Sequence, residues 1–152
     1  MTKEEDIKSA LAKRFPYLDG KIRVQRARRI FVDLATDKFK EVFEYAIDEL
    51  GFCIFSTITG LDEGSTLGFI YHVAREDGII LSMKINVDKN NPVLETVTGY
   101  FPCADIYERE LVDLLGVKVE GLPKGNRYPL SDDWPEGEYP LRKDWKAGES
   151  KK

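Results

Sequence analysis

The sequence predicts an α+β fold in which helices pack on one face of a mostly antiparallel sheet, followed by an extended, irregular C-terminal tail. Two N-terminal segments carry apolar residues at helical spacing, and three segments of strand character follow with polar turns between them. From residue 117 onward the chain carries four prolines and keeps no period. We therefore divide it into an α+β domain, residues 1–116, and a tail, residues 117–152, that cannot build its own core and is expected to bind a partner.

The N-terminal segment is predicted to begin with a short amphipathic helix. Thr2 and Glu5 have the spacing of a capping box, and the apolar periodicity that follows ends near Pro16. Residues 21–35 are then expected to be extended, because residues 30–34 alternate in the way that is typical of a strand.

The second helix has the clearest pattern in the chain. Thr36 or Asp37 can cap it, an apolar stripe of helical period runs through residues 39–50, and Gly51 suits the C′ position. Three strands are predicted after it, at residues 52–58, 67–74 and 79–87.

Two shorter elements are predicted before the tail. Residues 93–98 are expected to form a short helical turn. Residues 103–115 are expected to form a third helix, which Gly116 stops.

Composition limits the classes of function. The net charge of −4 gives no reason to expect nucleic acid as a partner. No apolar run is long enough to span a bilayer, and the N-terminus is too acidic and polar for a signal peptide. The sequence therefore predicts a cytoplasmic protein.

The supply of soft metal ligands is small. An iron–sulfur cluster normally takes four cysteines and a structural zinc site four Cys or His ligands, whereas this chain has only Cys53, Cys103 and His72. We expect no metal bound by this chain and a hydrogen-bonded strand histidine. The two cysteines are expected to be buried thiols or, for Cys103, to lie near the start of a helix.

The helix predicted over residues 103–115 carries a dense set of charges that lie three or four residues apart. One exposed ion pair contributes only about 0–1 kcal/mol, so such a set is better explained as a structural network than as an acid–base catalyst. We expect it to lock the tail in place, with Arg142 and Lys143 as candidate partners. The helical charges are Glu108, Arg109, Glu110 and Asp113.

Both tryptophans of the chain and two of its tyrosines lie in the irregular tail. Aromatic side chains on an extended segment suggest an interface anchor rather than a core. The residues expected at a partner interface are Tyr128, Trp134, Tyr139 and Trp145.

Two pieces of the sequence resemble a known family. Residues 108–116 match the Glu-Arg-Glu-x-x-Asp-Leu-x-Gly signature of the 30 kDa-subunit family of complex I and its membrane-bound hydrogenase relatives. Residues 139–145 match the Pro-Leu-Arg-Lys-Asp-aromatic segment of the same family. The resemblance extends from about residue 30 to residue 145. The chain departs from the usual pattern at Ile106 and Leu122, which leaves the branch open, although residues 133–140 look closer to the hydrogenase branch.

The resemblance implies a non-catalytic assembly subunit of a heteromeric complex. Such a subunit binds no cofactor and packs on the large subunit in the hydrophilic arm, on the cytoplasmic side of the membrane. The complex around it carries iron–sulfur clusters and, depending on the branch, a nickel–iron centre or a quinone site. The family signature and expected tail clamp comprise Glu108, Arg109, Glu110, Asp113, Gly116, Arg142, Lys143 and Asp144.

Two other functions stay open at this point. A stand-alone enzyme would need a pocket beside the acidic helix with carboxyl groups of perturbed pKa. A stand-alone regulatory domain would bind an anionic ligand or partner through the basic run at residues 21–29, which can equally be a solvated strand edge.

Overall fold

The computed structural model describes residues 2–148, and these form two compact units. The first unit comprises Met1–Thr59 and Phe69–Asn86, and the second comprises Gly60–Gly68 and Val87–Lys152. The expected division into residues 1–116 and a partner-binding tail, 117–152, stays a prediction. Its last four residues lie outside the described part of the chain.

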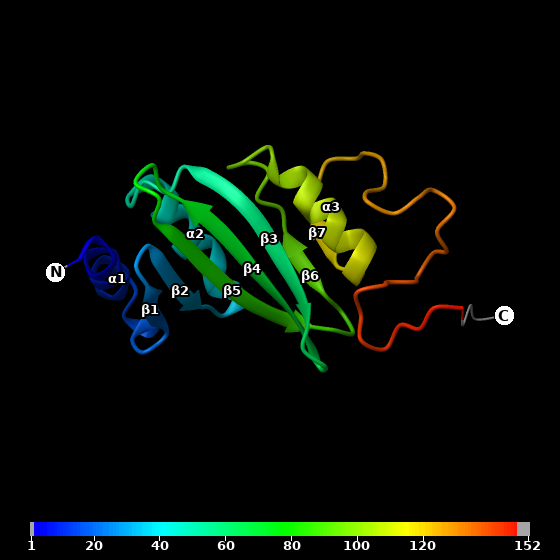
Figure 1. Cartoon of the computed structure of the whole chain (residues 1–152), viewed down its shortest axis with the longest axis horizontal. Helices are drawn as coiled ribbons and strands as arrows, with labels where there is room; N and C mark the ends of the chain where they lie inside the picture. The colour runs from blue at the N-terminus through cyan, green and yellow to red at the C-terminus, as the bar shows by residue number, and fades with distance from the viewer. Residues whose placement is uncertain (1, 149–152) are drawn as a thin grey trace. The chain divides into compact units, whose positions relative to one another are not determined.

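A five-stranded sheet runs in the order β1-β2-β5-β4-β3 (Figure 1). β1 pairs with β2 antiparallel, whereas β2 pairs with β5 in parallel. The predicted α+β class with a mostly antiparallel sheet is confirmed, with this parallel pair as the exception. The strands are β1 (Ile22–Arg26), β2 (Arg29–Asp33), β3 (Ile54–Asp62), β4 (Thr66–Ala74) and β5 (Ile80–Asp88).

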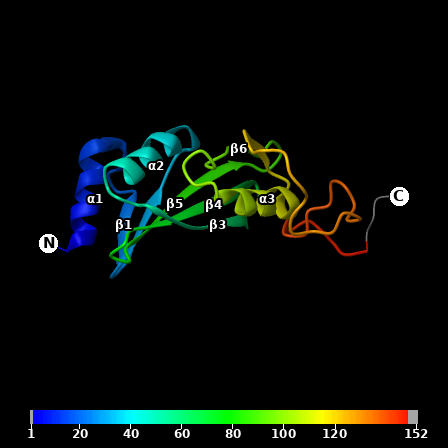
Figure 2. The ribbon, with the colours of Figure 1, turned by 90° about the horizontal axis from the view of Figure 1, so that it is seen from above.

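In the first unit, α2 (Phe39–Asp48) lies on one face of this sheet and α1 (Lys3–Arg14) lies beside the edge strand β1 (Figure 2). Helix α1 begins as predicted, because the Thr2 hydroxyl accepts the backbone N–H of Glu5. Helix α2 follows a 3-10 turn, and its Phe39 ring lies 4.5 Å from that of Tyr71 on β4. The buried side chains of both helices and of the alternating strands form the core.

The segment predicted to be extended over residues 21–35 is a hairpin. Its turn at Ala27 and Arg28 carries no Gly, Asn, Asp or Pro, so the usual hairpin signal is missing from the sequence. The β1–β2 pair is therefore visible only in the structure.

The second unit contains a small parallel sheet and one helix. Strand β6 (Val93–Glu95) pairs with β7 (Lys118–Glu120), and the backbone N–H of Thr96 donates to Glu120 O. The helical turn predicted over residues 93–98 is thus wrong, because a three-residue strand is too short to show a period. Helix α3 (Ala104–Leu115) ends before Gly116, as predicted. No helix among the described residues is long and apolar enough to cross a membrane.

Candidate functional site

Helix α3 carries a buried carboxylate that binds the segment after β6. The Glu108 side chain is fully buried, and its two oxygens accept the hydroxyl of Thr96 at 2.6 Å and the backbone N–H of Val97 at 2.7 Å. Burial raises the pKa of Glu108, although these two hydrogen bonds favour the ionised form. Glu108 therefore fixes α3 to its preceding loop and has no room to act on a substrate.

A second buried carboxylate of α3 binds the tail. Asp113 accepts hydrogen bonds from Arg127 Nε at 3.1 Å and from the backbone N–H of Leu130 at 3.0 Å. The Arg127 guanidinium also donates to the carbonyl oxygen of Trp134 at 2.8 Å. A tail arginine thus binds a carboxylate of the acidic helix. This arginine is Arg127, whereas the sequence suggested Arg142 and Lys143 as the partners.

The signature arginine of α3 holds the start of the irregular segment. Arg109 pairs with Asp105, one turn earlier, with 3.1 Å between Nε and Oδ2. It also donates to the carbonyl oxygen of Pro123, and a Cβ at Gly125 would overlap its guanidinium group. Residues 123–128 and the first turns of α3 line a shallow groove of about 730 Å³. This groove includes neither of the two buried carboxylates.

The C-terminal end of α3 is closed by two residues of the second signature piece. Gly116 has a left-handed conformation with φ +70°, and a Cβ there would overlap the ring of Tyr139. Arg142 Nε donates to the carbonyl oxygen of Leu115 at 2.7 Å. The last carbonyls of a helix lack intrahelical partners and carry partial negative charge, so a guanidinium is well suited to this position.

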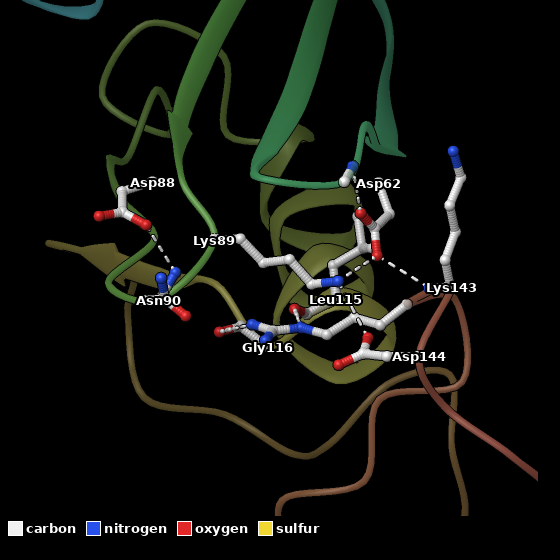
Figure 3. A network of polar contacts seen from close by, with 10 residues as sticks. Asp62, Asp88, Lys89, Asn90, Leu115, Gly116, Lys143 and Asp144 are labelled. Carbon is white, nitrogen blue, oxygen red and sulfur yellow. Dashed lines mark hydrogen bonds and ion pairs between the residues drawn. The ribbon is translucent and has the colours of Figure 1, made fainter.

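The tail is also bound to the turn between β3 and β4. Asp62 accepts hydrogen bonds from Lys89 Nζ and from the backbone N–H of Lys143, both at 2.8 Å, and from that of Gly64 at 2.9 Å. Lys89 Nζ also lies 3.0 Å from Asp144 Oδ1. Figure 3 shows the Lys89 ammonium between the two carboxylates.

These contacts shift the protonation equilibria of the cluster. Burial alone would raise the pKa of Asp62, but the hydrogen bonds from Lys89, Gly64 and Lys143 outweigh it and lower the pKa to about 2. The hydrogen bonds that Lys89 donates to Asp62 and Asp144 raise its own pKa. The sequence pattern gave no sign of the roles of Asp62 and Lys89, because the Asp-Glu-Gly sequence there indicates only a turn.

The four aromatic residues of the tail differ in their surroundings. The rings of Trp134 and Trp145 lie 5.8 Å apart, and their indole N–H groups donate to the carbonyl oxygen and the carboxylate of Glu138, respectively. Tyr139 is half-buried against the end of α3, whereas Tyr128 is 43% exposed. Their role at a partner interface stays a prediction.

The remaining signature residues are less strongly held. Glu110 is half-buried on α3. Lys143 contributes its backbone N–H to the Asp62 cluster, and the residue is exposed. The clamping role expected of these two side chains stays a prediction.

The single histidine and the two cysteines lie elsewhere. His72 is a half-buried residue of β4, with Nδ1 2.8 Å from Ser82 Oγ, and burial lowers its pKa. Cys53 and Cys103 are both exposed, so their predicted burial is wrong. Cys103 is the N-cap of α3, which agrees with the alternative expected for it, and Cys53 immediately precedes β3. Within residues 2–148, no group of three or more His, Cys, Asp or Glu side chains could hold a metal ion.

Comparisons with known proteins agree with this architecture. The family model described as the respiratory-chain NADH dehydrogenase 30 kDa subunit matches residues 32–151. The chain is 30% identical over 143 residues to the membrane-bound hydrogenase subunit beta of Pyrococcus furiosus, covering 90% of this chain and 83% of the relative. It is 29% identical over 160 residues to the NADH-quinone oxidoreductase subunit 5 of Thermus thermophilus, covering 91% and 74%, respectively.

A solved structure extends the likeness to three dimensions. A chain in the structure of the membrane-bound sulfane sulfur reductase, described as an archaeal respiratory membrane complex, superposes with a TM-score of 0.83 at 29% identity. The match covers 96% of this chain and 87% of that chain.

Proposed function

The chain belongs to the family of the respiratory-chain NADH dehydrogenase 30 kDa subunit, and on this premise we propose that it is a non-catalytic assembly subunit. It works in the hydrophilic arm of a complex I-like dehydrogenase or a membrane-bound [NiFe] hydrogenase. Its similarity to a hydrogenase subunit and to an NADH-quinone oxidoreductase subunit supports both branches.

The observation that carries the proposal is the use of the signature residues inside the second unit. Asp113 binds Arg127, Arg142 binds the end of α3, and Asp144 binds Lys89. A buried, fully paired carboxylate holds backbone in place and does not exchange protons with a substrate. The signature therefore supports a structural role, in which α3 fixes the path of a proline-rich segment.

The proposed docking surface is that segment and its apolar side chains. Tyr128 and Leu141 are exposed by 43% and 53%, and both belong to a tail whose backbone is fixed from α3. Rigid aromatic anchors lose little entropy on binding. We infer that this surface packs on the large subunit of the complex, on the cytoplasmic side of the membrane. The subunit itself binds no cofactor, and the iron–sulfur clusters, and the nickel–iron centre or the quinone, belong to other chains.

A pair of exposed-residue variants tests the docking surface. Tyr128→Ala and Leu141→Ala together remove apolar surface, and neither side chain is buried in the second unit. We expect the affinity-tagged double variant to recover at least about tenfold less large subunit under mild extraction. Ile54→Ala, at a 47% exposed position of β3 in the first unit, is the matched control and should recover the parental amount.

Two results would contradict the proposal. Unchanged recovery of the large subunit by a folded double variant would remove the tail from the interface. Recovery of the unmodified chain only as a free monomer from its native cell would remove the assembly role itself.

A further inference from the structure

The β1–β2 hairpin concentrates positive charge in an acidic protein. Five of the chain's 23 basic residues lie within nine consecutive positions that contain no acidic residue, and the net charge of the chain is −4. β1 is the edge strand of the five-stranded sheet. We call this set the basic hairpin: Lys21, Arg23, Arg26, Arg28 and Arg29.

The turn of the basic hairpin contains a residue whose backbone conformation is unfavourable for most amino acids with a side chain. Arg28 has φ +62°, and within residues 2–148 it is the only residue other than glycine with positive φ. Gly and Asn adopt this conformation at much lower cost. The fold uses the Arg28 backbone N–H, which donates to Glu4 Oε1 at 2.6 Å, and a glycine would keep that bond. That backbone bond, which lowers the pKa of Glu4, therefore does not require an arginine, although the Arg28 charge helps to lower the same pKa and the Arg28 side chain lies beside Gly78.

A second unfavourable feature lies at the same turn. Arg26 and Arg29 are directly opposite each other in the β1–β2 register. Like charges at directly opposite positions destabilise a strand pair. Local strain and charge repulsion concentrated at one exposed turn indicate a use outside the fold.

We propose that the basic hairpin is a second docking surface, which binds an acidic segment of a neighbouring subunit. Arg23 shows the kind of contact, because its guanidinium lies 2.8 Å from Asp33 Oδ2 and 4.3 Å from the centre of the Phe31 ring. Asp33 and Glu4 place carboxylates among the arginines, so a phosphate backbone with closely spaced charges would be repelled in part. Separate carboxylates on a peptide can reach the arginines and avoid both acids.

This proposal rests on the proposed function in one respect: the chain must be part of an assembled complex. The Tyr128 and Leu141 variants act in the second unit, and the basic hairpin lies in the first. A complex that forms but does not engage the hairpin would remove this inference and leave the proposed function intact.

Photo-crosslinking in the assembled complex tests the surface. Ala27 is exposed between Arg26 and Arg28, so it can be replaced by p-benzoylphenylalanine, irradiated, and the linked product identified by mass spectrometry. We expect a peptide of another subunit in which acidic residues outnumber basic ones. A yield that falls at least about fivefold with Arg26→Glu, and not with Lys40→Glu, would support charge recognition. Lys40 is an exposed residue of α2, and its reversal changes the net charge by the same amount.

The alternative outcomes overturn the proposal. Crosslinks only to lipid would assign the hairpin to the membrane surface, and crosslinks to nucleic acid or to nothing would leave it without a protein partner. An equal loss with Lys40→Glu would show a general charge effect.

A stability measurement separates binding from folding. Arg28→Gly should melt at or above the temperature of the parent protein, because glycine suits the left-handed backbone. The same variant should reduce the crosslink at Ala27. A variant that melts lower, with its crosslink unchanged, would show that Arg28 serves the fold alone.

Discussion

Glu108 and Gly116 show what single signature positions do in this protein. Glu108 lies inside the second unit and binds the backbone of the loop after β6. Gly116 provides a left-handed residue and leaves room for the Tyr139 ring. The hydrogen bonds of Glu108 and the conformation of Gly116 both serve the backbone and the packing. A substitution at either position should therefore lower the stability of the fold.

Replacing Glu108 separates its hydrogen bonds from its charge. Glu108→Ala should lower the free energy of unfolding by about 2–4 kcal/mol, because it leaves the Val97 N–H without its acceptor and opens a cavity. Glu108→Gln keeps an acceptor for Val97 and can donate to Thr96, so it should cost less than about 1 kcal/mol. Urea unfolding at neutral pH measures both, and equal losses would contradict the hydrogen-bond role.

Gly116→Ala should destabilise the protein in two ways, through backbone strain and through overlap of the new Cβ with the Tyr139 ring. The left-handed conformation alone costs a non-glycine residue about 1–2 kcal/mol, and the Cβ would also meet the Tyr139 ring. Gly137→Ala is the matched control, with φ +77° and open space around its Cβ position. We expect the melting temperature to fall clearly further for Gly116→Ala, and similar falls would show that the ring moves aside.

At the scale of elements, α3 and the β3–β4 turn hold the tail in two different ways. The tail binds α3 through Arg127 and Arg142, which contact a buried carboxylate and the last carbonyls of the helix. It binds the turn through Asp62, whose oxygens collect donors from the turn, from Lys89 and from the tail backbone. The attachment to α3 uses the Asp113 carboxylate and a carbonyl at the helix end, whereas the attachment to the turn uses the Asp62 carboxylate alone.

The Asp62 cluster should make stability depend on pH in the acid range. Its pKa is about 2 in the folded protein, against an ordinary value of 3.8, so the ionised group stabilises the fold above about pH 4. That contribution, about 2 kcal/mol from the shift, is lost as the pH falls towards 2. The difference in unfolding free energy between the parent and Asp62→Asn should therefore shrink between pH 5 and about pH 2. A difference that stays constant would contradict the ionic role.

At the scale of the whole molecule, the irregular C-terminal segment is held by its own chain. The backbone N–H groups of Leu130, Leu141 and Lys143 donate to Asp113, Leu114 and Asp62, respectively. Proline-rich composition excluded a separate core but gave no indication of these bonds. We therefore expect the second unit to hold its tail on a fixed path before any partner binds.

Hydrogen exchange on the isolated protein tests this. The amides of Leu130, Leu141 and Lys143 should exchange at least about tenfold more slowly than those of Lys124 and Asn126 in the segment over the groove. Arg142→Ala should speed exchange at Leu141. Uniformly fast exchange through residues 121–148 would show that the tail becomes ordered only on its partner.

The elements that could be predicted are those with a local signal. The Thr2 cap, the stripe of α2 and the stop at Gly116 each lie within a few residues of the helix they define. The hairpin at Arg28 and the strand β6 were missed for the opposite reason. One lacks the residues that mark a turn, and the other is too short for a period.

The sequence by itself determined the fold class, the family signature and the helix ends, because these depend on periodicity and on neighbours along the chain. Only the tertiary structure decided which charges meet. Asp113 takes Arg127, whereas Arg142 goes to the carbonyl of Leu115, and Asp62 joins Lys89 to the tail. A sequence fixes neighbours three or four positions apart on a helix, but partners separated by an irregular segment depend on the path of that segment, which packing alone sets.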